Sequence, residues 1–191
     1  MTVRDTDEQD APLLKALRED LDQGFVMLFE AYRGLVFSTA LRLSGRWADA
    51  EDLTAEAFLR AFRALSGYDA DRIGSLRPRA WVMTILMNLW RNQHRDGQRR
   101  PLLDLTGEDV EEVDPGESVE AAAERRETGD ELAAMLRRLP DDQRACVVLR
   151  HVSGFAVSEI ADVLGLPQGT VKSHVSRGLK RLRALTEGGA R

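Results

Sequence analysis

The chain has few of the residues that build covalent or metal-based sites. Among its 191 residues there is one cysteine, Cys146, and there are three histidines. A single thiol excludes a disulfide within the chain and a zinc site built from several cysteines. The histidines lack a metal-ligating spacing such as HExxH, so we expect no metal site and no bound cofactor. Cys146 lies in the apolar stretch ACVVL, which favours a buried, unreactive thiol.

Long apolar runs are also missing from the sequence. None approaches the ~18–20 residues that a membrane-spanning helix needs, so we expect no membrane insertion. Residues 1–23 hold seven acidic and three basic side chains, without the positive start and apolar core of a secretory signal. We therefore expect the chain to stay in the cytoplasm. With 43% apolar and 31% charged residues, its composition is that of a globular protein.

The net charge of -5 hides an uneven distribution of acids and bases. Residues 101–131 carry twelve acidic and two basic side chains, and residues 1–23 are also acidic. The blocks 24–100 and 132–191 are basic, with twelve bases against eight acids and ten against five. Basic blocks of this kind in an acidic chain are compatible with nucleic-acid binding or with ordinary solvated surface charge.

Apolar periodicity predicts helices throughout both basic blocks. Apolar residues recur every three or four positions over 25–43, 48–65 and 78–90, and again from Leu132 to the C-terminal end. No alternating strand pattern occurs, so we predict an all-α protein with two helical domains. We predict an acidic N-terminal segment over 1–23, a first domain over 24–100, a flexible acidic linker over 101–127 and a second domain over 128–191.

The second domain carries a candidate DNA-reading motif. The short helix SEIADVLG, a Gly-bearing turn and the stretch GTVKSHVSRGLKRLR have the pattern of a helix-turn-helix. The last stretch holds five Lys or Arg residues and no acid, and a helical wheel places them opposite a narrow apolar stripe. A solvated basic helix is the alternative. The predicted DNA contacts are Gln168, Thr170, Lys172, Ser173, His174, Ser176, Arg177, Lys180 and Arg181, with His174 beside the apolar stripe.

Three stretches together resemble a known family. DAEDLTAEAFLRAFRAL, from Asp49 to Leu65, resembles the core-enzyme-binding helix of the extracytoplasmic-function (ECF) sigma factors, the short two-domain group of the sigma-70 family. RAWVMTILMNLWRNQHR resembles that family's promoter-melting helix. LPDDQRACVVLRHVSGFAVSEIADVLGLPQGTVKSH is similar to its fourth conserved domain. The resemblance covers about residues 24–96 and 128–186 and leaves the acidic segments unmatched.

The resemblance implies two partners, core RNA polymerase and promoter DNA. It assigns an acidic face and nearby apolar residues to the clamp helices of the polymerase's largest subunit. These residues are Asp49, Glu51, Asp52, Leu53, Glu56 and Phe58. By spacing alone, the carboxylates could equally form a solvated helix start or a weak divalent-metal site.

The third predicted helix would hold the melted minus-ten element. The residues that match the family there are Trp81, Asn88, Asn92 and Arg95, although Trp81 also lies on the apolar stripe and could belong to the core. The loop from Ser66 to Arg79 would help to set which base is read. A flipped base needs amide hydrogen-bonding groups and an aromatic or apolar wall, and cations hold single strands.

The basic C-terminal helix would read the minus-thirty-five element. The resemblance also implies that the free domains are mobile or are held by an inhibitory partner, an anti-sigma factor. A self-standing helix-turn-helix regulator is the alternative function, but residues 1–100 lack the alternating strands of a receiver domain. An enzyme is the third possibility. We expect no catalytic activity, because no nucleophile-and-base constellation is present.

Overall fold

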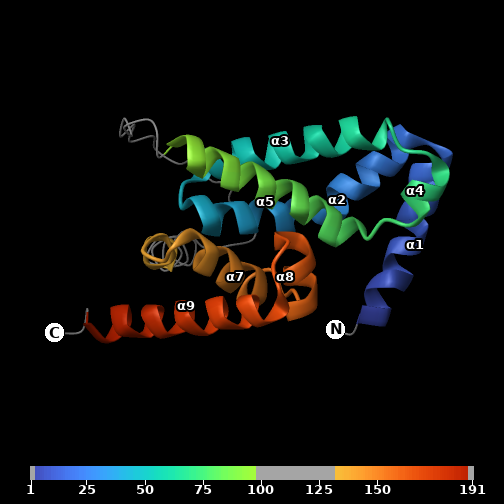
Figure 1. Ribbon diagram of the computed structural model, residues 1–191. Coiled ribbons are helices and arrows are strands. Elements are labelled where there is room, and N and C mark those ends of the chain that lie inside the picture. The colour runs from blue at the N-terminus through green and yellow to red at the C-terminus, as the bar shows by residue number, and fades with distance from the viewer. Residues whose placement is uncertain (1–2, 98–131, 189–191) are drawn as a thin grey trace, which may run out of the picture.

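The computed structural model describes residues 3–97 and 132–188, and throughout these ranges every regular element is a helix. The prediction of an all-α fold is confirmed. The predicted linker 101–127 lies outside the described residues. The labelled helices are α1 (Val3–Glu19), α2 (Leu21–Ser44), α3 (Trp47–Leu65), α4 (Ala70–Gly74), α5 (Pro78–Gly97), α7 (Asp141–His151), α8 (Val157–Leu164) and α9 (Gln168–Gly188), and residues 132–137 are also helical (Figure 1).

Helices α2 and α3 form a hairpin joined by aromatic contacts. Helix α2 starts where the Asp20 carboxylate accepts hydrogen bonds from the backbone N–H groups of Asp22 and Gln23. It ends at Gly45, whose φ of 71° lies in the left-handed region that glycine tolerates. Edge-to-face ring pairs then join the two helices at centroid distances of 4.6 to 5.0 Å: Phe25–Phe62, Phe29–Phe58 and Phe37–Trp47. These rings fix the hairpin on which α5 packs.

The acidic N-terminal segment is part of the fold. Most of the predicted segment 1–23 forms α1, which packs against α2 and α4. Leu13 and Leu17 are buried, being 5% and 2% exposed. The acidic composition of the segment did not indicate this helix, in which Asp10 is buried and Glu19 is exposed.

The C-terminal helices are separated at Pro140 and by the predicted Gly-bearing turn at Gly165. Helix α8 begins at Val157, one residue before the predicted stretch SEIADVLG. The Glu159 carboxylate accepts a hydrogen bond of 2.7 Å from the backbone N–H of Ala156. This satisfies one of the donors that a helix start leaves unpaired.

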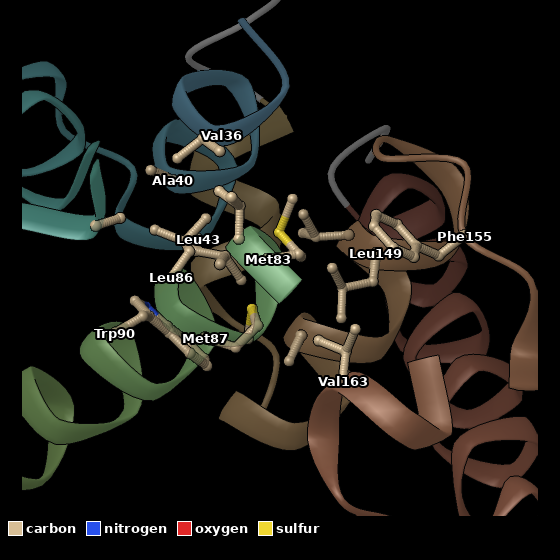
Figure 2. Close-up of a cluster of buried hydrophobic side chains, with 14 of the residues drawn as sticks. Val36, Ala40, Leu43, Met83, Leu86, Met87, Trp90, Leu149, Phe155 and Val163 are labelled. Carbon is tan, nitrogen blue, oxygen red and sulfur yellow. The ribbon is translucent and has the colours of Figure 1, made fainter. Parts of the chain in front are cut away.

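The N-terminal bundle (α1–α5) and the C-terminal unit (residues 132–188) share one apolar core. Helix α5 lies between α3 on one side and α8 on the other, and α7 packs on α2 (Figure 1). Met83 and Met87 of α5 lie toward Leu149, Phe155 and Val163 of the C-terminal unit (Figure 2), and all five side chains are buried. Two predicted domains are thus closed on each other along a buried apolar surface.

Polar groups also cross this boundary. Buried Arg144 donates to the carbonyl oxygen of Leu43 at 2.8 Å and forms an ion pair of 2.6 Å with Asp141. Burial lowers the pKa of Arg144, and the nearby Asp141 carboxylate opposes that effect. Arg137 donates to the carbonyl oxygen of Gly45 at 3.2 Å. The closed arrangement therefore satisfies backbone acceptors at the end of α2.

Helix α2 is long and apolar enough to cross a membrane by length and composition. Its packing accounts for this character without a membrane, because α2 contacts α1, α3, α5 and α7. Its buried residues include Leu28, Val36, Ala40 and Leu43, each with no exposed surface.

Candidate nucleic-acid interface

Helices α8 and α9 are joined by a tight turn at Gly165 and Pro167. Gly165 has a φ of 64°, and the N–H of Leu166 donates to the carbonyl oxygen of Ala161 at 3.0 Å. Helix α9 then starts directly after Pro167, whose carbonyl oxygen accepts from the N–H groups of Thr170 and Val171. The predicted helix-turn-helix is therefore present in the structure.

One side of α9 is fixed tightly on α7. Val171 has no exposed surface. A Cβ placed on Gly178 would lie 2.6 Å from Cγ2 of Val147, so only glycine allows this approach. The opposite side of α9 is consequently directed to solvent.

The exposed side of α9 carries most of the predicted DNA contacts. Gln168, Lys172, Ser173, Ser176, Arg177, Lys180 and Arg181 are exposed, while Thr170 and His174 are partly buried. Nδ1 of His174 is buried without a hydrogen-bond partner, which agrees with its predicted place beside the apolar stripe. The acid within α9 is Glu187, at its far end. An extended surface of cations and hydroxyl groups matches a phosphate backbone.

Helix α5 carries the second predicted site. Trp81 is half-buried, and Asn88 and Asn92 are exposed, separated from Trp81 by two and three helical turns. Arg95 lies in α5, but its side chain is outside the described residues. The structure therefore aligns an aromatic wall and two amides along this helix.

Two residues of the predicted loop from Ser66 to Arg79 lie beside Trp81, although the sequence did not single them out. The Tyr68 ring lies 6.1 Å from that of Trp81 in a tilted arrangement, and the Arg72 guanidinium lies 3.7 Å above the Tyr68 ring. An aromatic residue and an arginine in a polar loop are a weak signal of such a stack. Rings and guanidinium planes of this kind are the groups on which unpaired bases stack.

The C-terminal unit contacts two arginines of α5. Arg91 donates to the carbonyl oxygen of Leu164 at 3.0 Å. Arg79 donates to the carbonyl oxygen of Ser153, and its guanidinium lies 4.0 Å above the Phe155 ring. In the closed arrangement these two arginines therefore link α5 to the C-terminal unit.

The acidic face of α3 is only partly as predicted. Glu51 and Asp52 are exposed, while Asp49 and Glu56 are half-buried and lie 3.9 and 2.7 Å from Arg46 and Arg60. Leu53 and Phe58 are core residues, 0% and 3% exposed. The predicted apolar contacts of this face are thus inaccessible in this arrangement.

An exposed apolar residue that the sequence did not single out lies on the same helix. Leu59 of α3 is 43% exposed and lies two turns from Asp52.

Among the described residues, no group of three or more His, Cys, Asp or Glu side chains is placed to hold a metal ion.

Two family models match the chain. Sigma-70 region 2 matches residues 28–100, which include α3 and α5, and sigma-70 region 4 matches residues 129–182, which include the helix-turn-helix. The ECF RNA polymerase sigma factor EcfG of Rhodopseudomonas palustris is 35% identical over 176 residues, covering 91% of this chain and 87% of the relative. The ECF RNA polymerase sigma factor SigW of Bacillus subtilis is 27% identical, covering 89% and 92%.

Two solved structures are similar over both halves of the chain. CnrH in complex with the cytosolic domain of CnrY has a TM-score of 0.68 at 26% identity, covering 94% of this chain and 97% of that one. The sigma factor RpoE in complex with the anti-sigma factor NepR from Bartonella quintana has a TM-score of 0.61 at 28% identity, covering 88% and 98%. With both regions matched and relatives aligned along most of its length, the chain belongs to the ECF RNA polymerase sigma factors of the sigma-70 family.

Proposed function

We propose a division of labour for this sigma factor. The second predicted domain (128–191) binds the minus-thirty-five element through α9. The first predicted domain (24–100) binds the melted minus-ten strand through α5 and core polymerase through α3. The carrying observation is the exposed face of α9, which holds cations and hydroxyl groups on a tightly seated helix-turn-helix. The chain performs no covalent chemistry in this role, and its place of action is the cytoplasm, where the polymerase and promoter DNA lie.

The minus-thirty-five contacts divide by position along α9. Gln168, Lys172 and Ser173 lie in its first two turns, the part of a recognition helix that reaches base edges. Arg177, Lys180 and Arg181 follow along the exposed side and bind phosphates. His174 packs beside the stripe.

The minus-ten contacts combine stacking and hydrogen bonding. The half-buried Trp81 supplies a wall, and the exposed amides of Asn88 and Asn92 bond a base edge. Arg95 of the same helix supplies a cation. Support comes from the neighbouring Tyr68 ring, which lies 6.1 Å from that of Trp81 and adds to the aromatic surface.

Polymerase binding uses the exposed part of the α3 face. Glu51 and Asp52 supply charge, and Leu59 supplies the apolar contact that buried Leu53 and Phe58 cannot make. A cationic clamp surface is the complement of such a face. Asp49 and Glu56 form ion pairs with Arg46 and Arg60 and so stabilise the helix.

Promoter binding requires the closed arrangement to open. By their names, the two elements lie about 25 base pairs apart, which is ~85 Å at ~3.4 Å per base pair. A compact body of about 150 residues has a radius of gyration of ~15 Å and cannot span that distance. The chain from Gly97 to Leu132 is long enough to reach ~110 Å when extended.

A protein partner can oppose this opening. Both solved relatives described above are complexes, one with an anti-sigma factor and one with the cytosolic domain of CnrY. We infer that a partner of the anti-sigma class holds the two units of this chain together. Promoter DNA and polymerase would then compete with that partner.

Runoff transcription with core polymerase across a promoter library tests the division of labour. Lys172→Ala with Arg177→Ala should lower promoter-specific transcripts at least about tenfold and leave polymerase binding unchanged, because both side chains are on α9. Glu51→Arg with Asp52→Arg should abolish polymerase binding and leave duplex binding by α9 intact. Glu19→Arg, an exposed reversal on α1, is the control. Equal loss of polymerase binding in both double variants would refute the proposal.

A further inference from the structure

Helix α1 precedes the stretch that matches sigma-70 region 2, yet it packs as part of the N-terminal bundle. Its buried residues Leu13 and Leu17 pack on α2. A Cβ on Gly24 would lie 2.4 Å from the backbone nitrogen of Leu17, so the two helix backbones nearly touch. Close seating of this kind fixes the position of α1 relative to α2.

A buried hydrogen bond links the middle of α1 to α2. The Tyr32 hydroxyl donates to Oδ1 of Asp10 at 2.5 Å, and the two residues are 8% and 7% exposed. Burial, and then the bond to Asp10, raise the pKa of Tyr32 well above its ordinary value. A charge-assisted bond in a dry setting is directional, so it also fixes the rotation of α1.

Helix α1 is in turn the main support of α4. Among the described helices, α1 is the principal packing partner of this five-residue helix. The Arg18 side chain runs over Gly74, where an added Cβ would lie 3.6 Å from Nη1 of Arg18. Ile73 anchors α4 in the apolar core, because its side chain is only 5% exposed.

Helix α4 belongs to the segment 66–79, which carries the rings beside Trp81. The Asp69 carboxylate caps α4 by accepting from the N–H of Arg72 at 2.7 Å. Arg72 lies over Tyr68, and Tyr68 lies against Trp81. Any shift of α4 is therefore transmitted directly to the aromatic surface of the proposed minus-ten site.

We propose that α1 is a positioning helix for minus-ten base selection. The Asp10–Tyr32 bond sets the place of α1, and α1 holds α4 and with it the Tyr68 and Arg72 stack against Trp81. This inference rests on the proposed assignment of the minus-ten site. Asp10, Tyr32 and Arg18 are positioning residues, because none of them contacts the strand.

Base preference measured on the holoenzyme tests this role. Full-length chain and core polymerase are mixed with single-stranded oligonucleotides randomised over the minus-ten segment, and the recovered sequences give the ratio of preferred to other bases. Asp10→Ala and Tyr32→Phe should each lower that ratio at least about threefold, the equivalent of one lost hydrogen bond. Asp10→Asn keeps an acceptor and should restore most of the ratio. Binding of a minus-thirty-five duplex should not change.

Two controls separate positioning from loss of stability. Val36→Ala removes methyl groups from the core away from α4 and should lower thermal stability without altering the ratio. Arg18→Ala leaves the core intact and should shift the ratio in the same direction as Asp10→Ala, whereas Lys15→Ala, an exposed change on the same helix, should not.

The outcomes distinguish the two levels of the proposal. If Trp81→Ala and Asn88→Ala change minus-ten selection while Asp10→Ala and Arg18→Ala do not, the positioning role of α1 is overturned. If Val36→Ala changes the ratio of preferred to other bases as much as Asp10→Ala does, the positioning role is also overturned. If Trp81→Ala and Asn88→Ala leave selection unchanged, the minus-ten assignment itself fails.

Discussion

Thr39 and Ser153 meet across the boundary between the N-terminal bundle and the C-terminal unit. Their hydroxyl oxygens lie 2.8 Å apart although the residues are 114 positions apart in the sequence. The Thr39 hydroxyl donates to the carbonyl oxygen of Leu35 at 2.7 Å, so its oxygen is the acceptor for the Ser153 hydroxyl, and both side chains are buried. Buried hydroxyl groups need partners, so each residue stabilises the closed arrangement through the other.

A double-mutant cycle on this pair should show coupling. Thr39→Val and Ser153→Ala should each lower the free energy of unfolding by ~1–2 kcal/mol, because each leaves the other hydroxyl group less well satisfied. The double variant should lose less than the sum, with a coupling energy of ~0.5–1.5 kcal/mol. Urea denaturation of the full chain measures all four corners. Strict additivity would mean that the hydroxyl groups contribute independently.

The apolar boundary should open when a charge is placed in it. Met83 has no exposed surface and lies between the two units (Figure 2). A buried ammonium without a partner costs several kcal/mol, so Met83→Lys should separate the units. Small-angle scattering should show a larger radius of gyration, with helix content retained. The control is Met27→Lys at a methionine that is 44% exposed, which should leave the radius unchanged.

Local pattern predicted the helices but not the surfaces that they bury. Spacing located α3, α5 and the helix-turn-helix, because each has a regular apolar stripe and a Gly or Pro boundary. Met83 lies off the apolar stripe predicted for α5, and it is buried because the C-terminal unit packs on that side of the helix. Leu53 and Phe58 lie on the predicted apolar stripe of α3, and the structure buries both, whereas the polymerase contact that the resemblance assigns to them stays a prediction.

Long-range polar contacts were the least predictable part of the site. Arg79 and Arg91 read in sequence as ordinary cations of a basic block, and in the structure they bind carbonyl oxygens of the C-terminal unit. Such bonds join residues more than 70 positions apart. Residue spacing in the sequence cannot predict these hydrogen bonds, because the partner is a backbone oxygen that every residue possesses.

Salt dependence should separate phosphate contacts from base contacts on α9. Arg177→Ala or Lys180→Ala should reduce the slope of log binding constant against log salt concentration by ~0.9 for each phosphate contact removed. Gln168→Ala should keep the slope and relax the base preference. Fluorescence anisotropy with minus-thirty-five duplexes at several salt concentrations measures both quantities. Lys15→Ala on α1 is the control for a lost surface charge, and a reduced slope in that variant would assign the effect to net charge.

Cys146 gives the fold a stability that depends on pH. The thiol has no exposed surface, and burial, with a smaller contribution from the Asp142 carboxylate, raises its pKa from 9.0 to about 11. Below pH 9 the thiol is protonated in both the folded and the unfolded chain, so it adds no pH dependence. Above pH 9 the unfolded chain releases this proton while the folded chain keeps it. Unfolding is then favoured increasingly until the folded thiol also ionises.

The free energy of unfolding should therefore fall more steeply from pH 9 to pH 11 in the wild-type chain than in Cys146→Ala. The comparison is necessary because Tyr32, whose pKa is also raised, titrates with the same sign at higher pH. Urea denaturation at half-unit pH steps measures the difference between the two chains. A native thiol that stays protonated should also resist a thiol reagent at pH 8 until the chain unfolds. Parallel stability curves, or rapid labelling of the folded chain, would show that the Cys146 thiol is open to solvent.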